Sequence, residues 1–176
     1  MTLRILRKVT FYENSRLLTG GRRASVGAIP EGLGVDSLGI NCGRGPVQMK
    51  HILKEILAWT SLPVIVNPNA GLPRSEGGKT VYDIDADEFA STMRDMVQMG
   101  AAIVGGCCGT TPEHIRKTAQ LCREIGRLPI KKKEHTVISS FAQAVTIGRD
   151  PVLVGERINP TGKSRFKQAL REHDME

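Results

Sequence analysis

Three short apolar runs, each followed by a helical pattern, constrain the fold of this chain more than any other feature. The runs are about Val35–Cys42, Leu62–Val66 and Ala101–Gly105. Apolar residues in the segments that follow recur at i, i+3, i+4 and i+7, the spacing of one helix face. Buried strands that alternate with amphipathic helices predict an α/β fold with a parallel sheet covered by helices.

The helices and loops can be placed from their ends. Helices are expected at about Val47–Trp59, at Ala86–Met99 and from Thr111 to about Ile125, with prolines or glycines near their termini. A loop rich in Gly and Pro is expected over Asn67–Gly78, and a further strand within Lys8–Tyr12. A connector over 127–150 is expected to hold short strands within Val137–Gly148.

Three of the four cysteines stand where a predicted strand ends. Cys42 closes the first strand, and Cys107 and Cys108 follow the third strand in a glycine-rich run. Neighbouring residues within a strand point to opposite faces of the sheet, so two adjacent cysteines inside a strand could not bind the same metal ion. Beyond the end of the strand they could, because glycines permit an irregular backbone there. Three thiolates meeting there would form a zinc site with a fourth position open. Simple core packing remains the alternative, since free cysteines are often buried.

Cys122 is expected to have a different role. It lies at helical spacing from Ile115, Ala119 and Ile125, which places it on the buried face of a helix. No disulfide is expected, because the start of the chain lacks the pattern of a secretion signal and the thiols of a cytoplasmic protein stay reduced.

The cysteine motifs resemble a known family. The runs Gly39–Cys42 and Gly105–Pro112 are similar to the zinc signature of the homocysteine S-methyltransferase domain, and Pro63–Pro73 is similar to the loop found between them. Further on, Val154–Lys163 resembles the opening of a pterin-binding domain. The motifs in this order resemble the family of cobalamin-dependent methionine synthases, from about Thr10 to the end of the chain.

This resemblance implies a fold and an activity. The fold would be the C-terminal portion of a (β/α)8 TIM barrel plus the first strand–helix unit of a second barrel; a doubly wound sheet also fits the pattern alone. The activity would be zinc-dependent methyl transfer to homocysteine, giving methionine. Cys42, Cys107 and Cys108 would hold Zn²⁺, and the methyl group would come from methyltetrahydrofolate through cobalamin on a cobalamin-binding domain or subunit.

Five polar residues complete the implied sites. Asn41, Asn67 and Asn69 would position substrate or support the metal loops, and shaping their turns is the alternative role. Glu156 and Asn159 match the pterin motif, with strand-end capping as the alternative.

The resemblance also implies a division of the chain. Residues 1–127 would belong to the homocysteine-binding barrel, 128–150 to a linker, and 151–176 to the start of a pterin-binding domain, with a strand at Val152–Val154 and a helix from Ser164. A barrel needs eight strands and about 250 residues, so we expect a piece of a longer protein that is inactive in isolation.

The segment Gly20–Gly34 departs from the family pattern. A helix is expected there, but glycines and a proline interrupt it, at about 1 kcal/mol for each Gly and about 3 kcal/mol for Pro. The sequence therefore predicts a degraded helix at this position, with an altered sequence over residues 20–34 as the alternative.

The formal charge of +7 excludes few classes of function. Apart from Lys131–Lys133, the basic residues are scattered and carry no interleaved aromatic residues, which favours a solvated surface over nucleic-acid binding. No apolar run approaches the length of a membrane span, so we expect a cytoplasmic enzyme. The alternatives are a non-catalytic fragment, a structural zinc module, or a methyltransferase that uses another donor such as betaine. The pterin-like run argues against another donor.

Overall fold

The structure is a computed structural model that describes residues 4–12, 17, 20–148, 150–155 and 159–174. The chain divides into two compact units, Met1–Thr146 and Ile147–Glu176. The first unit contains the predicted sheet and cysteines, and each unit is described by itself.

A parallel sheet of four strands forms the centre of the first unit, in the order β1-β2-β3-β6. The strands are β1 (Leu6–Val9), β2 (Ser37–Asn41), β3 (Val64–Asn67) and β6 (Ile103–Val104). The α/β class and the parallel sheet are confirmed. The strand predicted within Lys8–Tyr12 exists but begins earlier, at Leu6.

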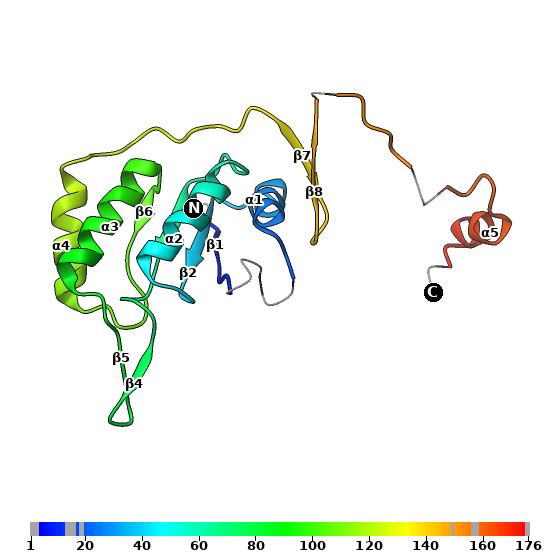
Figure 1. The fold of residues 1–176 in the computed structure, drawn as a ribbon. Helices are drawn as coiled ribbons and strands as arrows, with labels where there is room; N and C mark the ends of the chain where they lie inside the picture. Colours follow the sequence, from blue (N-terminus) through cyan, green and yellow to red (C-terminus); the bar gives the residue numbers. More distant parts are fainter. Residues whose placement is uncertain (1–3, 13–16, 18–19, 149, 156–158, 175–176) are drawn as a thin grey trace. The chain divides into compact units, whose positions relative to one another are not determined.

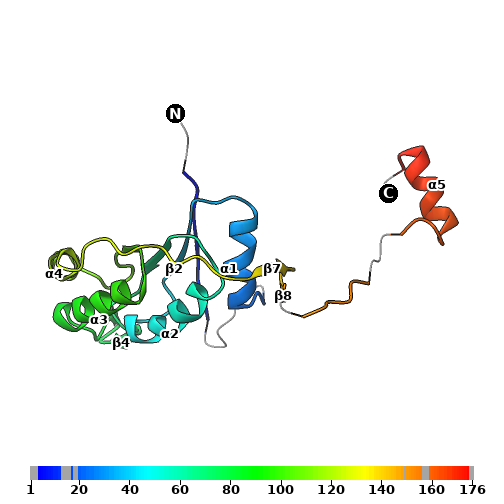
Figure 2. The same ribbon diagram turned by 90° about the horizontal axis from the view of Figure 1, so that it is seen from above.

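Four helices accompany this sheet. They are α1 (Arg23–Gly32), α2 (Pro46–Leu57), α3 (Ala86–Met99) and α4 (Pro112–Arg123). Each helix packs against the next, so that α4, α3, α2 and α1 follow one another around the strands (Figures 1 and 2). None of the described helices is long and apolar enough to cross a membrane.

The core lies between the sheet and these helices. Strand residues such as Leu38 and Val66 are fully buried, and they belong to one cluster with Phe89, Met93 and Met96 of α3. The opposite face of the sheet carries a row of paired residues from the four strands, Lys8, Gly39, Ile65 and Ile103. The methionines of α3 are thus core residues, as their spacing predicted.

The prediction of a degraded helix within Gly20–Gly34 is wrong, because α1 spans Arg23–Gly32. Its glycines do little harm to the helix. Gly27 faces Trp59 so closely that an added Cβ would lie 2.8 Å from the Cβ of that tryptophan. Pro30 is buried in the second half of the helix. Tertiary packing therefore outweighs the unfavourable helix propensity that the sequence alone displays.

The loop predicted at Asn67–Gly78 holds an unexpected hairpin. Strands β4 (Arg74–Glu76) and β5 (Lys79–Val81) pair antiparallel and extend away from the sheet (Figure 1). Gly77 and Gly78 form the turn, with φ of +56° and +75°. Two successive positive φ angles suit a two-residue hairpin turn, and glycine adopts them without strain.

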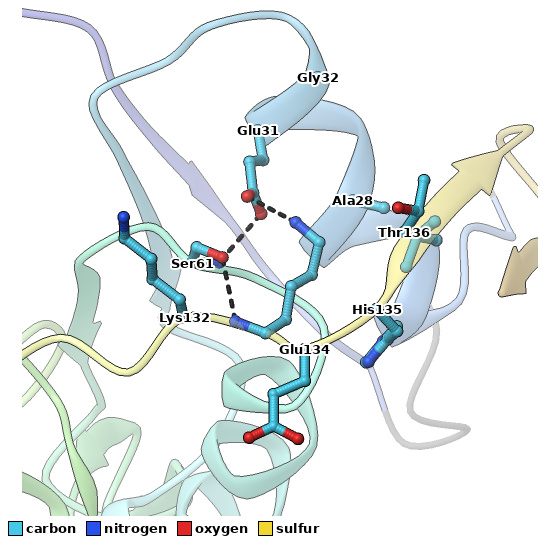
Figure 3. A pocket seen from close by; sticks show the side chains of 10 residues that line it. Ala28, Glu31, Gly32, Ser61, Lys132, Glu134, His135 and Thr136 are labelled. Carbon is cyan, nitrogen blue, oxygen red and sulfur yellow. Dashed lines mark hydrogen bonds and ion pairs between the residues drawn. The ribbon is translucent and has the colours of Figure 1, made fainter. Parts of the chain in front are cut away.

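The connector after α4 runs back over α1. It contains β7 (Thr136–Ser139) and β8 (Ala144–Ile147), so the prediction of short paired strands is confirmed. The carboxylate of Glu31 binds the Lys133 ammonium at 2.5 Å and accepts a bond from the Ser61 amide at 2.9 Å. These groups line a cavity of about 560 Å³, and Figure 3 shows Glu31 and Ser61 at its wall. This contact fastens the connector to the first unit.

The second unit contains one described helix, α5 (Ser164–Glu172). The strand predicted at Val152–Val154 is wrong, because these residues form no regular structure and the side chain of Leu153 is fully exposed. A strand forms only beside a partner, and among the described residues no strand pairs with this run. A complete first strand–helix unit of a second barrel is therefore not observed.

Candidate metal centre

The three cysteines stand at the carboxyl edge of the sheet, where parallel strands end together. Cys42 directly follows β2, while Cys107 and Cys108 follow β6 after two glycines. Strand β3 pairs with both β2 and β6, so the loop after β3 lies between the two cysteine loops. The order of the strands thereby brings together thiols that are 66 residues apart in the chain.

The sulfur atoms form a compact triangle. The Sγ atom of Cys108 lies 3.7 Å from Sγ of Cys42 and 3.8 Å from Sγ of Cys107, and all three atoms lie within 4.8 Å of one another. Thiolates bound tetrahedrally to zinc at 2.3 Å would be about 3.8 Å apart. Both the sulfur donors and their spacing therefore fit a zinc ion.

Backbone hydrogen bonds from the loop after β3 hold both cysteine loops. The amide of Cys42 donates to the carbonyl of Asn67 at 2.9 Å, and the amide of Cys107 donates to the carbonyl of Pro68 at 2.8 Å. The carbonyl of Cys108 accepts a bond from the amide of Ala70, also at 2.9 Å. The positions of the sulfur atoms are thus set by the sheet and by this loop.

Side-chain amides reach the same cluster. Asn69 is buried, and its Oδ1 accepts a bond from the amide of Cys108 at 3.2 Å. Asn41 donates from Nδ2 to Sγ of Cys107 at 3.7 Å. Asn67 of β3 is paired with Asn41 of the neighbouring strand β2. The Oδ1 atom of Asn67 accepts a bond from the ammonium of Lys8 at 3.3 Å.

The thiols differ in how readily they lose a proton. Burial alone would raise the pKa of Cys42, but hydrogen bonds from the Gly43 amide, the thiols of Cys108 and Cys107, and the Asn69 side chain outweigh it and lower this pKa. Burial raises the pKa of Cys107, and the neighbouring thiol of Cys42 raises it further. Cys42 is therefore the first of these two thiols to become a thiolate.

Cys42 also has an unusual backbone. Its φ of +57° lies in the left-handed region, which costs a residue with a side chain of order 1 kcal/mol. This conformation occurs at the residue directly after β2, whose thiol faces the thiols of the loop after β6. Cys108 is exposed, so one side of the cluster is open to a further ligand.

Two further side chains reach this region without any signal in the sequence. Tyr82 follows β5, and its ring packs on Gly109, next to Cys108. Burial and then the neighbouring Cys108 sulfur raise the pKa of Tyr82. Lys8 crosses over Gly39 to reach Asn67. No sequence motif identifies either residue. The β4–β5 hairpin brings Tyr82 to the cluster, and the pairing of β1 with β2 brings Lys8 there.

The remaining residues singled out from the sequence lie elsewhere. Cys122 is half-buried in α4, where burial raises the pKa of its thiol, and it lines a separate cavity of about 750 Å³ near the start of β6. Asn159 accepts a bond from the amide of Thr161 at 2.8 Å, which is a local turn contact. Glu156 lies outside the described residues.

Comparison with known proteins was made once this geometry was established. The sequence pattern of the family described as Homocysteine S-methyltransferase matches residues 2–122, which include all three cysteines of the cluster.

Two curated relatives extend the similarity to the rest of the chain. A methionine synthase of Mycobacterium leprae (strain TN) is 34% identical over 177 aligned residues, which cover 96% of this chain and 15% of the relative. A methionine synthase of Mycobacterium tuberculosis (strain ATCC 25618 / H37Rv) is 33% identical over 171 residues, covering 96% of this chain and 14% of the relative. The chain thus spans about one seventh of the length of these relatives.

Proposed function

Because the chain belongs to the homocysteine S-methyltransferase family, we propose that it forms the zinc-binding part of an enzyme that methylates homocysteine to methionine. The observation that carries this proposal is the triangle of Sγ atoms from Cys42, Cys107 and Cys108 at the carboxyl edge of the sheet. Catalytic sites of barrel enzymes lie at this edge.

The three cysteines would act as metal ligands through their thiolates. A zinc ion held by them would supply a Lewis acid that keeps the thiol of homocysteine deprotonated near neutral pH. The exposed side of the cluster near Cys108 leaves room for that thiol. Methyl transfer then forms a bond between the sulfur and the methyl carbon, while the bond from the methyl group to its carrier breaks and leaves its electron pair on the carrier.

The asparagines would orient these groups. Asn69 accepts a bond from the amide of Cys108, so it would hold the position of that sulfur atom. The amide of Asn41 donates toward Cys107 and would stabilise its thiolate form. Asn67 and Lys8 present an amide and an ammonium group on the same side of the sheet, where they would meet the polar end of the amino-acid substrate.

We further propose the larger assembly that the two methionine synthases suggest. Residues 1–127 would form the C-terminal part of a (β/α)8 barrel, 128–150 a linker, and 151–176 the start of a pterin-binding domain in which Glu156 and Asn159 contact the pterin. The methyl group would pass from methyltetrahydrofolate through cobalamin, carried by a cobalamin-binding domain or subunit. The similarity of both relatives over 96% of this chain supports this reading.

Homocysteine binding tests the proposed function directly. The zinc-loaded chain would be titrated with L-homocysteine in a calorimeter, in two buffers of different ionisation enthalpy, and with methionine as the matched control. We expect homocysteine to release about one proton when it binds, because its thiol is held as a thiolate. Methionine has no thiol proton and should release none.

Two outcomes would contradict the proposal. A chain that takes up no zinc would remove its premise. A chain that takes up zinc but does not bind homocysteine would instead favour a structural zinc module.

A further inference from the structure

Two polar side chains lie flat across the sheet face opposite the helices, because glycines make room for them. The stem of Lys8 crosses Gly39 of the neighbouring strand, where an added Cβ atom would lie 2.5 Å from Cγ of Lys8. The Nδ2 atom of Asn67 covers Gly105 in the same way, also at 2.5 Å from an added Cβ atom. Bare backbone on the next strand therefore allows each side chain to extend along this face.

A row of polar groups connects the sulfur triangle with Lys8. Asn41 donates from Nδ2 to Sγ of Cys107 at 3.7 Å. Asn67 is paired with Asn41 on the neighbouring strand, and strands in a sheet are about 4.8 Å apart. The ammonium of Lys8 reaches across β2 and donates to Oδ1 of Asn67 at 3.3 Å. These steps place the ammonium on the order of 10 Å from the sulfur triangle.

The charge of Lys8 is not balanced by a carboxylate. Among the residues that the structure describes, its ammonium donates to the neutral amide of Asn67 and forms no ion pair. By contrast, Lys50, Lys117 and Lys133 each bind a carboxylate. Lys8 is exposed, so an anion can reach it, and an ammonium has further N–H donors to offer. The position therefore suits the carboxylate of a ligand.

We infer that Lys8 binds the carboxylate of the thiol substrate and thereby selects thiols that carry a carboxylate over thiols that lack one. The inference rests on the proposed function and deepens it, because it names the substrate group that Lys8 recognises. An extended homocysteine spans about 6 Å from its sulfur to its carboxylate oxygens. With a metal–sulfur bond at one end and a hydrogen bond at the other, its reach is about 10 Å, which matches the separation of Lys8 from the sulfur triangle.

Three thiols isolate the contribution of the carboxylate. They are L-homocysteine, mercaptobutyrate, which is homocysteine without its amino group, and aminopropanethiol, which is homocysteine without its carboxylate. Each would be titrated by calorimetry into the zinc-loaded full chain at low salt. We expect the two carboxylates to bind about tenfold more tightly than aminopropanethiol, because only they form a hydrogen bond between charged groups.

The substitution Lys8→Met removes the ammonium and keeps an apolar stem over Gly39. Homocysteine and mercaptobutyrate should bind this variant about tenfold more weakly, whereas aminopropanethiol should bind as it does to the parent. High salt should reduce the preference of the parent for carboxylates, because salt screens an exposed ion pair, and should have no such effect on the variant. Lys8→Gln, which keeps a polar end without the charge, should give the same pattern.

Arg7→Met is the matched control. Arg7 is the neighbouring basic residue of β1 and lies on the other face of the sheet, where it lines a small cavity with Val26. Its substitution changes the net charge by the same amount, so the preference for carboxylates should remain. Circular dichroism and zinc uptake would verify that each variant folds and loads as the parent does.

Four results would overturn the role of Lys8 and leave the proposed function intact. They are a parent that binds all three thiols equally, a preference that survives in both Lys8 variants, an equal loss of preference in Arg7→Met, and weaker binding of aminopropanethiol to both Lys8 variants. The last result would indicate a structural role. A zinc-loaded parent that binds none of the three thiols would instead overturn both this inference and the proposed function.

Discussion

The two units of the chain both carry motifs that resemble the same protein family, and among the described residues the motif of the first unit forms a side-chain cluster. In the first unit, β3 pairs with β2 and β6 and thereby brings three cysteines within 4.8 Å. In the second unit, the described part of the motif makes a local turn at Asn159, and α5 buries none of its residues. The difference teaches that a motif supplies the residue types, whereas neighbouring strands supply the geometry.

The largest effect should come from the cysteines. Cys107→Ser removes one of three proposed zinc ligands, so the protein should lose most of its bound zinc, as measured by elemental analysis after dialysis. Cys122→Ser is the matched control, since Cys122 lies in α4 beside a separate cavity, and it should retain about one zinc. Zinc that persists in a Cys107→Ser, Cys108→Ser double variant would contradict the assignment of these cysteines as zinc ligands.

A pair of phenylalanines compares the two units in free energy of unfolding. Phe89 is fully buried in α3, so Phe89→Ala should destabilise the first unit by about 3–5 kcal/mol. Phe166 is only half-buried in α5, and Phe166→Ala should change the same free energy by less than about 0.5 kcal/mol. Urea denaturation followed by the fluorescence of Trp59 measures both. Equal effects would show that α5 contributes to the same cooperative core.

Two glycines of α1 test whether packing against Trp59 stabilises this helix. Gly27→Ala places a Cβ atom 2.8 Å from the Cβ of Trp59, so α1 and Trp59 must move apart and the free energy of unfolding should fall by about 1–3 kcal/mol. Gly32→Ala lies in the same helix with nothing within 4 Å, and it should be neutral or stabilise by up to about 1 kcal/mol. Thermal unfolding compares the two. A neutral Gly27→Ala would mean that the approach of α1 to Trp59 is not tight.

The smallest effect concerns the connector. Burial alone would raise the pKa of Glu31, but the bonds from Lys133, Ser61 and Thr60 outweigh it and hold this pKa below its usual value of 4.5. A carboxyl group with a lowered pKa stabilises the fold fully above its ordinary pKa, and this contribution is lost as the pH falls through the lowered value. The connector should therefore loosen only at acid pH, with an effect of about 1 kcal/mol.

Tryptophan fluorescence can follow this loosening. Trp59 is the single tryptophan, and its ring meets that of His135 in the connector edge-on at 5.5 Å between centroids. The parent should show an acid step in fluorescence below about pH 4.5. Glu31→Gln cannot titrate, so an unchanged step in that variant would assign the transition to another group.

Agreement between sequence and structure was best where local patterns decide structure. The predicted bounds of α3 match the observed Ala86–Met99, because Asp85 caps its start through the amides of Asp87 and Glu88 and a glycine ends it. The predictions failed where distant packing decides. Helix α1 forms against Trp59 in spite of its composition, and Val152–Val154 stays irregular without a partner strand.

The sequence by itself determined which residues could form the centre. Its strand-ending cysteines, the glycines that surround them and the alternation of strands and helices are local features, which depend on residue type and spacing alone. Only the tertiary structure decided the strand order that places β3 between the cysteine loops, the approach of Asn69 to Cys108, and the arrival of Tyr82 from a hairpin. These are contacts between residues far apart in the chain, and they exist only because packing of the sheet against its helices brings the strand ends together.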